Sequence, residues 1–299
     1  MLSLRAVRTQ QYINGKPLIW RWQSWSLPIW PLINMMQPIL HFVHANSYPA
    51  GTYRVFFNHL RKHYDVQALS MHAHNPRYPV CNGWHALMLE LIDELTTRYN
   101  QPVVLAGHSM GGVLSLMAAK ARPDLVRCVV LLDSPVVAGW RALLLRIVKW
   151  LGADKKFSPA QFSEKRRNTW ANVEDAYLHY VSKDMFAIWP SEVLRDYLEH
   201  GLKSHPEGVT LRFTRETETA VYRSLPHHIG TIVRRSFPVP VGFIGGTDSV
   251  ECRQAGMVAT KRLVGRHFRL IPGGHLFPME SPARAASALH EVVQSLLHS

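Results

Sequence analysis

Short apolar runs alternate with longer amphipathic segments along most of this chain. Runs of strand length cover residues 38–44, 65–69, 102–106, 126–132, 239–244 and 267–271. Segments with helical spacing lie between or after them, over residues 51–63, 84–99, 110–121, 253–263 and 283–297. Within residues 84–99, Leu87, Leu91 and Leu95 share one face of a helix. Such alternation is typical of a parallel sheet covered by helices, so the pattern predicts an α/β fold with a mostly parallel central sheet.

Residues 139–236 depart from this alternation. The segment is polar, aromatic and helical in its spacing, with no clear buried strand before Val239. We interpret residues 139–236 as a helical cap inserted into a core domain made of residues 1–138 and 237–299. Its rings either line an apolar acyl pocket or hold the cap helices together. These rings belong to Trp140, Trp150, Phe157, Phe162, Trp170, Tyr177, Tyr180, Phe186 and Trp189.

The N-terminal segment predicts neither a membrane span nor a secretory signal. Residues 18–25 have the pattern of an early strand. The apolar stretch at residues 27–43 contains three prolines, and each removes a backbone donor, so a spanning helix there would be costly. Residues 1–12 are basic but no unbroken apolar region follows them, which argues against a secretory signal.

Composition indicates a globular and strongly basic protein. Of 299 residues, 47% are hydrophobic and 18% are charged, which is enough apolar material for a large core. Thirty-four basic and 21 acidic residues give a formal net charge of +13. The basic residues are spread in pairs such as Lys155-Lys156 and Arg234-Arg235, without the run that nucleic-acid arms carry. We therefore expect a solvated basic surface and no nucleic-acid partner. An anionic substrate or weak association with an anionic membrane surface is the alternative use of this charge.

The cysteines indicate a reducing compartment. Cys81, Cys128 and Cys252 are odd in number and lack the spacing of a zinc site or a disulfide framework. We expect a cytoplasmic protein without a structural metal.

Residues 107–112, GHSMGG, carry the most specific chemical signal in the chain. They match G-x-S-x-G between a predicted strand and a predicted helix, the pattern of a nucleophile elbow. Glycines two residues either side of Ser109 let strand and helix approach closely, while the turn raises the hydroxyl above the sheet. Free amides at the helix start face any negative charge that develops there. Ser109 is therefore the predicted nucleophile, and the amide of Met110 is one predicted oxyanion donor.

A serine nucleophile needs an imidazole base and a carboxylate that orients the imidazole. His275 follows the strand at residues 267–271 in a Pro-Gly-Gly-His loop, at the same predicted sheet edge as Ser109. Two aspartates are candidates for the acid. Asp248 follows the strand at residues 239–244 and gives the order serine, aspartate, histidine, so it is preferred. Asp133 ends the strand at residues 126–132 and stays as the alternative.

The second oxyanion donor is expected in the loop after the strand at residues 38–44. A backbone amide of Ala45 or Asn46 fits, with Asn46 preferred. Removing one such donor typically lowers the rate by about two to three orders of magnitude.

Together these residues resemble the α/β-hydrolase superfamily. The resemblance rests on the elbow at Ser109, the HGx-like string His44-Ala45-Asn46 and the late acid and histidine, and it covers nearly the whole chain. It implies a Ser-His-Asp triad, a helical cap and similarity to esterases, lipases and carbon-carbon bond hydrolases. Ala45 stands where the family often has glycine, and residues 70–80 lack the RGxGxS-like string of many members. The subfamily is therefore left open.

The predicted function is hydrolysis of a hydrophobic carboxylic ester or thioester through an acyl-enzyme on Ser109. Its partner is then a small-molecule ester, and no cofactor or metal is expected. Two alternatives remain: a carbon-carbon bond hydrolase with the same serine, and a catalytically silent module that binds a ligand or docks on a membrane. The latter is suggested by the net charge of +13 and the proline-rich apolar segment.

Overall fold

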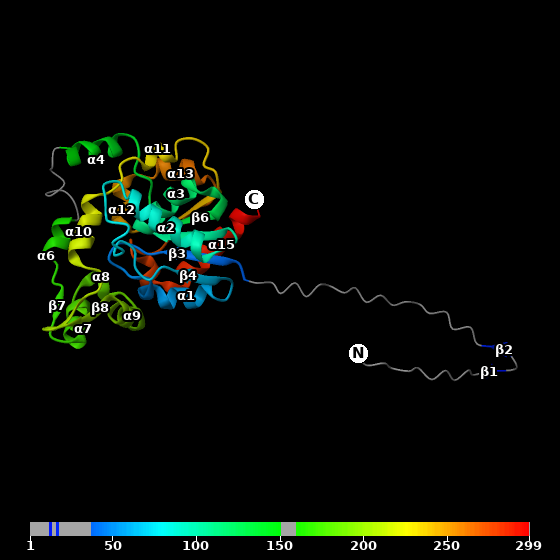
Figure 1. The fold of residues 1–299 in the computed structure, drawn as a ribbon, viewed down its shortest axis with the longest axis horizontal. Helices are drawn as coiled ribbons and strands as arrows, with labels where there is room; N and C mark the ends of the chain where they lie inside the picture. Colours follow the sequence, from blue (N-terminus) through cyan, green and yellow to red (C-terminus); the bar gives the residue numbers. More distant parts are fainter. Residues whose placement is uncertain (1–11, 14–15, 18–36, 151–159, 299) are drawn as a thin grey trace. The chain divides into compact units, whose positions relative to one another are not determined.

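The computed structural model describes residues 12–13, 16–17, 37–150 and 160–298. The strand expected at residues 18–25 and the first part of the apolar stretch at 27–43 lie outside these ranges. The chain forms two compact units, residues 1–36 and 37–299. In the first unit, β1 (Tyr12–Ile13) pairs with β2 (Lys16–Pro17) as an antiparallel hairpin. The second unit contains all the other described helices and strands (Figure 1).

A six-stranded parallel sheet forms the centre of the second unit. Its spatial order is β11-β10-β6-β5-β3-β4, and every neighbouring pair is parallel. The strands are β3 (Ile39–Val43), β4 (Asp65–Ala68), β5 (Val103–His108), β6 (Val126–Leu132), β10 (Val241–Gly246) and β11 (Phe268–Ile271). Every residue of the central strand β5 is buried, which explains its unbroken apolar sequence. The predicted α/β fold is confirmed.

Alternate residues of the sheet enter two separate cores. Val104 and Ala106 of β5 pack in one core, while Val103 and Leu105 pack in the other. The first core includes α1 (Arg54–Leu60) and α15 (Pro282–Leu297), which contact each other. The second includes α2 (His85–Arg98) and α3 (Met110–Ala121). Helices therefore cover both faces of the sheet. Because all six strands are parallel, their carboxyl ends lie at the same edge.

Shorter helical elements complete this core. They are η1 (Ala50–Tyr53), η2 (Pro123–Leu125), α12 (Val250–Ala255), α13 (Val258–Val264) and α14 (Phe277–Glu280). The single helix predicted at residues 253–263 is wrong, because α12 and α13 are two helices. The chain turns between them at Gly256, whose φ of 73° lies in the left-handed region.

Residues 139–236 contain seven described helices and a small antiparallel sheet. The helices are α4 (Trp140–Trp150), α6 (Ala160–Lys165), α7 (Val173–Val181), α8 (Asp184–Ala187), α9 (Ser191–Gly201), α10 (Arg215–Arg223) and α11 (Ile229–Ile232). The sheet has the order β7 (Thr169–Trp170), β9 (Gly208–Leu211), β8 (Leu202–His205). The sequence did not predict these strands, because segments of two to four partly exposed residues carry no periodic signal.

Several aromatic side chains of this region pack against one another. Trp170, Tyr180, Phe186 and Trp189 are buried, with ring centroids 4.8 Å apart for Tyr180–Phe186 and 4.7 Å for Phe186–Trp189. These rings hold the helices together, as one of the two interpretations expected. Among the described helices, none has both the length and the apolar character needed to cross a membrane.

Candidate active site

Ser109 lies on a tight turn between β5 and α3, as the sequence predicts. Its φ of 52° and ψ of −115° are strained for a residue with a side chain. A Cβ at Gly107 would lie 2.3 Å from the carbonyl carbon of Gly111, and a Cβ at Gly111 would lie 2.0 Å from the carbonyl oxygen of Val43. Only glycine fits at either position. These close approaches hold the start of α3 against both β5 and the loop after β3.

Backbone hydrogen bonds continue the sheet just beyond its strands and bring the site residues together. The Ser109 amide donates to the Leu132 carbonyl at 3.0 Å, and the Asp133 amide donates to the Ile244 carbonyl at 2.8 Å. The residues that directly follow β5 and β6 are thereby fixed side by side at the carboxyl edge of the sheet.

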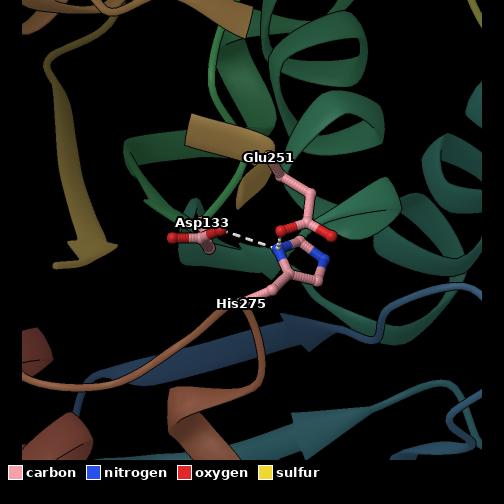
Figure 2. A group of neighbouring side chains, drawn as sticks. All are labelled: Asp133, Glu251 and His275. Atoms are coloured by element: carbon pink, nitrogen blue, oxygen red, sulfur yellow. Dashed lines mark hydrogen bonds and ion pairs between the residues drawn. The ribbon is translucent and has the colours of Figure 1, made fainter. Parts of the chain in front are cut away.

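His275 bridges the serine and an aspartate. The Ser109 hydroxyl donates to His275 Nε2 at 3.0 Å. His275 Nδ1 donates to Asp133 Oδ2 at 2.6 Å (Figure 2). The three residues come from the ends of β5, β6 and the loop after β11, which are far apart in sequence. The predicted pairing of Ser109 with His275 is present in the structure.

The preference for Asp248 as the acid is corrected by this geometry. Asp133, the alternative candidate, occupies the position beside His275, whereas the Asp248 side chain is exposed in the turn after β10. Asp248 instead donates its backbone amide to the Gly273 carbonyl at 2.9 Å. The turn after β10 thus supports the histidine loop through its backbone.

Asp133 is buried and accepts hydrogen bonds on both carboxylate oxygens. Oδ1 accepts from the Gly246 amide at 2.8 Å and from Cys252 Sγ at 3.2 Å. Oδ2 accepts from the Ser249 hydroxyl at 2.6 Å as well as from His275. Burial alone would raise the pKa of this carboxyl. The hydrogen bond from His275, the charge of His275, and the hydrogen bonds from Ser249 and the Gly246 amide together hold the pKa below its usual value. Asp133 is therefore ionised where the histidine needs a charged partner.

A second carboxylate lies near His275. Glu251 Oε2, from the first turn of α12, is 3.7 Å from His275 Nδ1 and its side chain is 48% exposed (Figure 2). Burial lowers the pKa of His275, but the hydrogen bond with Asp133 and the charge of Glu251 outweigh it, so the pKa lies above its usual value. Sequence reasoning missed Glu251, because a glutamate in the first turn of a helix is an ordinary capping feature.

Asp133, Glu251 and His275 also have the spacing of a metal site. Their ligand atoms lie within 4.8 Å of one another, and no other group of this kind occurs among the described residues. Asp133 already accepts four hydrogen bonds from protein groups, which explain its position in this group.

Met110 and Asn46 carry the two amides that the sequence predicts as oxyanion donors. Met110 is the first residue of α3, and no acceptor for either amide occurs within the described ranges. The Ala45 amide is unsuitable, because it already donates to the Tyr53 hydroxyl at 3.2 Å. Of the two loop candidates, the structure therefore favours Asn46.

His108 links this loop to the loop that carries His275. The Tyr53 hydroxyl donates to His108 Nδ1 at 2.7 Å, and His108 Nε2 donates to the His275 carbonyl at 2.9 Å. Burial, together with the charge of His275, lowers the pKa of His108 to about 3, so it stays neutral. His108 therefore positions the active-site histidine through its backbone and does not compete as a base. No sequence pattern indicated the role of Tyr53.

Residues of the inserted region hold the loop after β3 from the other side. Asn46 Nδ2 donates to the Glu218 carbonyl at 3.2 Å. Arg166 donates to the Ser47 hydroxyl at 2.6 Å and forms an ion pair with Glu218 at 2.9 Å. The position of the predicted oxyanion loop thus depends on α10 and on the segment just after α6.

A serine lies on a strained strand-to-helix turn at the edge of a parallel sheet, hydrogen-bonded to a histidine that in turn bonds an aspartate. This arrangement is that of a serine-hydrolase type of site. The chain belongs to the alpha/beta hydrolase family, whose profile matches residues 42–288. That range contains the elbow, Asp133 and His275.

Known proteins of this family resemble the chain in sequence and in fold. Over 78 residues it is 36% identical to Lipase LipV of Mycobacterium tuberculosis (strain ATCC 25618 / H37Rv), a match that spans 26% of this chain and 30% of the lipase. The crystal structure of E-2-(acetamidomethylene)succinate hydrolase has a TM-score of 0.70 at 19% identity, over 86% of this chain and 91% of that one. An M. tuberculosis esterase has a TM-score of 0.63 at 16% identity, over 87% and 86% of the two chains. At such identities the two structures establish the fold alone.

Proposed function

We propose that this protein hydrolyses carboxylic esters or thioesters with Ser109 as nucleophile, His275 as base and Asp133 as the acid. The observation that carries the proposal is the continuous contact from Ser109 Oγ to His275 Nε2, at 3.0 Å, and from His275 Nδ1 to Asp133, at 2.6 Å. The similarity to Lipase LipV supports a hydrophobic acyl group as the substrate class. We further propose residues 139–236 as the cap over this site.

The reaction proceeds by acyl transfer. His275 Nε2 removes the Ser109 proton as Oγ bonds to the carbonyl carbon, and the amides of Met110 and Asn46 stabilise the oxyanion. Collapse of this intermediate breaks the bond to the leaving alcohol or thiol, which takes the proton from His275. Water then attacks the acyl-enzyme through the same groups, releasing the acid and regenerating Ser109. Asp133 keeps the proton of His275 on Nδ1 throughout.

A fluorophosphonate probe tests the nucleophile directly. We expect it to label the wild-type protein, to leave Ser109→Ala unlabelled, and to label Ser204→Ala normally, because Ser204 is an exposed hydroxyl on β8. Ser109→Ala should also lose the hydrolysis of p-nitrophenyl esters of increasing acyl length, whereas Ser204→Ala should keep it. Folded wild-type protein that takes up no label would refute the enzymatic proposal and favour a silent binding module. Turnover of a vinylogous diketone without ester turnover would instead assign carbon-carbon bond hydrolysis.

A further inference from the structure

A large cavity lies apart from the triad, beside α4, α11 and α13. Its volume is about 740 Å³, which is within the range of small-molecule sites. Val136 is among the residues that line it, but none of Ser109, Asp133 and His275 is. Figure 1 shows α4, α11 and α13 grouped on one side of the second unit. The proposed ester hydrolysis makes no use of this space.

The charged groups of the cavity are all basic. Arg141, Arg146, Arg234 and Arg262 line it, and no aspartate or glutamate does. Across the described parts of the chain, none of these four guanidinium groups forms an ion pair. Arg141 is half-buried and the other three arginines are exposed. Four like charges around one cavity without a carboxylate favour a bound anion, less so at high salt.

Arginine and aromatic contacts prepare part of this lining. The Arg141 guanidinium carbon lies 4.5 Å from the centroid of the Trp140 ring, a cation–π contact. Arg234 and Arg262 also line a neighbouring cavity of about 420 Å³, so they stand where the two cavities adjoin.

Apolar side chains at the same cavity face solvent. The exposed fractions are 65% for Trp140, 49% for Leu143 and 85% for Val258. Leu144 and Ile147 continue this face of α4, at 51% and 42%. Clustered exposed apolar residues are uncommon on a soluble surface unless a ligand or a partner covers them.

We propose that this cavity binds one molecule of an anionic amphiphile, with a carboxylate or phosphate head among the arginines and a hydrocarbon tail against Trp140, Leu143 and Val258. Arginine pairs with both kinds of head group through two parallel hydrogen bonds. Because the site is a cavity of small-molecule size, a single bound molecule suits it better than the surface of a bilayer. The proposal does not depend on Ser109.

Calorimetric titration with monomeric dodecanoate, below its micelle concentration, tests the proposal. Ser109→Ala serves as the background, so that no turnover interferes. We expect one strong site, and much weaker binding of dodecyltrimethylammonium and of butyrate, which lack the negative head and the long tail respectively. Equal affinity for the cationic and anionic dodecyl compounds would refute the basic site.

Charge reversal locates the site. The double variant Arg234→Glu/Arg262→Glu should lower the affinity at least about tenfold, since each lost charge-assisted hydrogen bond is worth at least that much. Arg127→Glu/Arg284→Glu changes the net charge equally at exposed positions outside the cavity and should bind as the background does. Thermal denaturation checks that both remain folded. Unchanged affinity in the first double variant would overturn the proposal.

Two further measurements separate the outcomes. Val258→Asp should weaken dodecanoate binding without affecting fluorophosphonate labelling of Ser109 in the otherwise wild-type chain. Cosedimentation with phosphatidylglycerol vesicles, but no binding of monomeric dodecanoate, would replace the cavity site by a membrane-docking surface. Because labelling reports on Ser109 and calorimetry reports on the cavity, failure of one proposal is distinguishable from failure of the other.

Discussion

The carboxylate of Glu251 should control the pH at which the enzyme loses activity in acid. His275 can remove the Ser109 proton only while its imidazole is neutral, so activity falls as the pH drops through the pKa of His275. The negative charge of Glu251, 3.7 Å from Nδ1, favours the charged imidazolium and therefore raises that pKa. Replacing Glu251 by glutamine removes the charge and keeps the shape. The acidic limb of kcat/KM should then move to lower pH.

The size of this displacement follows from the separation. Two unit charges 3.7 Å apart interact by about 1.1 kcal/mol at the dielectric constant of water, about 80. Because about 1.4 kcal/mol corresponds to one pKa unit, the limb should move by about 0.8 pH units. The water value suits Glu251, whose side chain is about half exposed, and a lower effective dielectric constant would increase the displacement.

The assay is the pH dependence of kcat/KM for a p-nitrophenyl ester at low ionic strength. Glu207→Gln, at an exposed position in the turn between β8 and β9, is the matched control and should leave the limb where it is in the wild type. Added salt should reduce the difference between Glu251→Gln and the wild type, because exposed charges are screened. A limb that does not move in Glu251→Gln, or that moves to higher pH, would refute this electrostatic reasoning.

Three other substitutions test the site and its supports. Asp133→Asn should lower kcat by roughly 10⁴-fold, the loss that a wrong histidine tautomer causes in serine proteases, whereas Asp248→Asn should change it little; equal losses in steady-state assays would undo the choice of Asp133. Gly111→Ala places a Cβ 2.0 Å from a backbone oxygen and should destabilise the protein by at least about 1–3 kcal/mol, measured by urea denaturation. Tyr53→Phe leaves the Ala45 amide and His108 Nδ1 without their partner and should cost about 1–3 kcal/mol; an unchanged melting temperature would show that water replaces the hydroxyl.

The core of the fold could be predicted because each of its elements follows a strong local pattern. The bounds of β6 and α3 agree with the predicted strand at residues 126–132 and helix at residues 110–121. Buried parallel strands are nearly all apolar, so they stand out between amphipathic helices. The small sheet β7-β9-β8 could not be predicted, since its strands are too short for a period to be visible. The break at Gly256 was equally hidden, because one glycine within a helical pattern does not by itself end a helix.

The choice between Asp133 and Asp248 could not be made from the sequence for a geometric reason. β6 and β10 are adjacent parallel strands, so an aspartate after either one reaches the same edge of the sheet. The carboxylate that turns toward His275 is decided by the hydrogen-bond donors around it. The donors to Asp133, which follows β6, come from the turn after β10. The Gly246 amide and the Ser249 hydroxyl, on either side of Asp248, both point to Asp133. If Asp133 after β6 is the acid, the turn after β10 is free to contribute these donors and to bring Glu251 within 3.7 Å of His275 Nδ1. We therefore expect separate roles for the two carboxylates: Asp133 orients His275, and the half-exposed Glu251 raises its pKa.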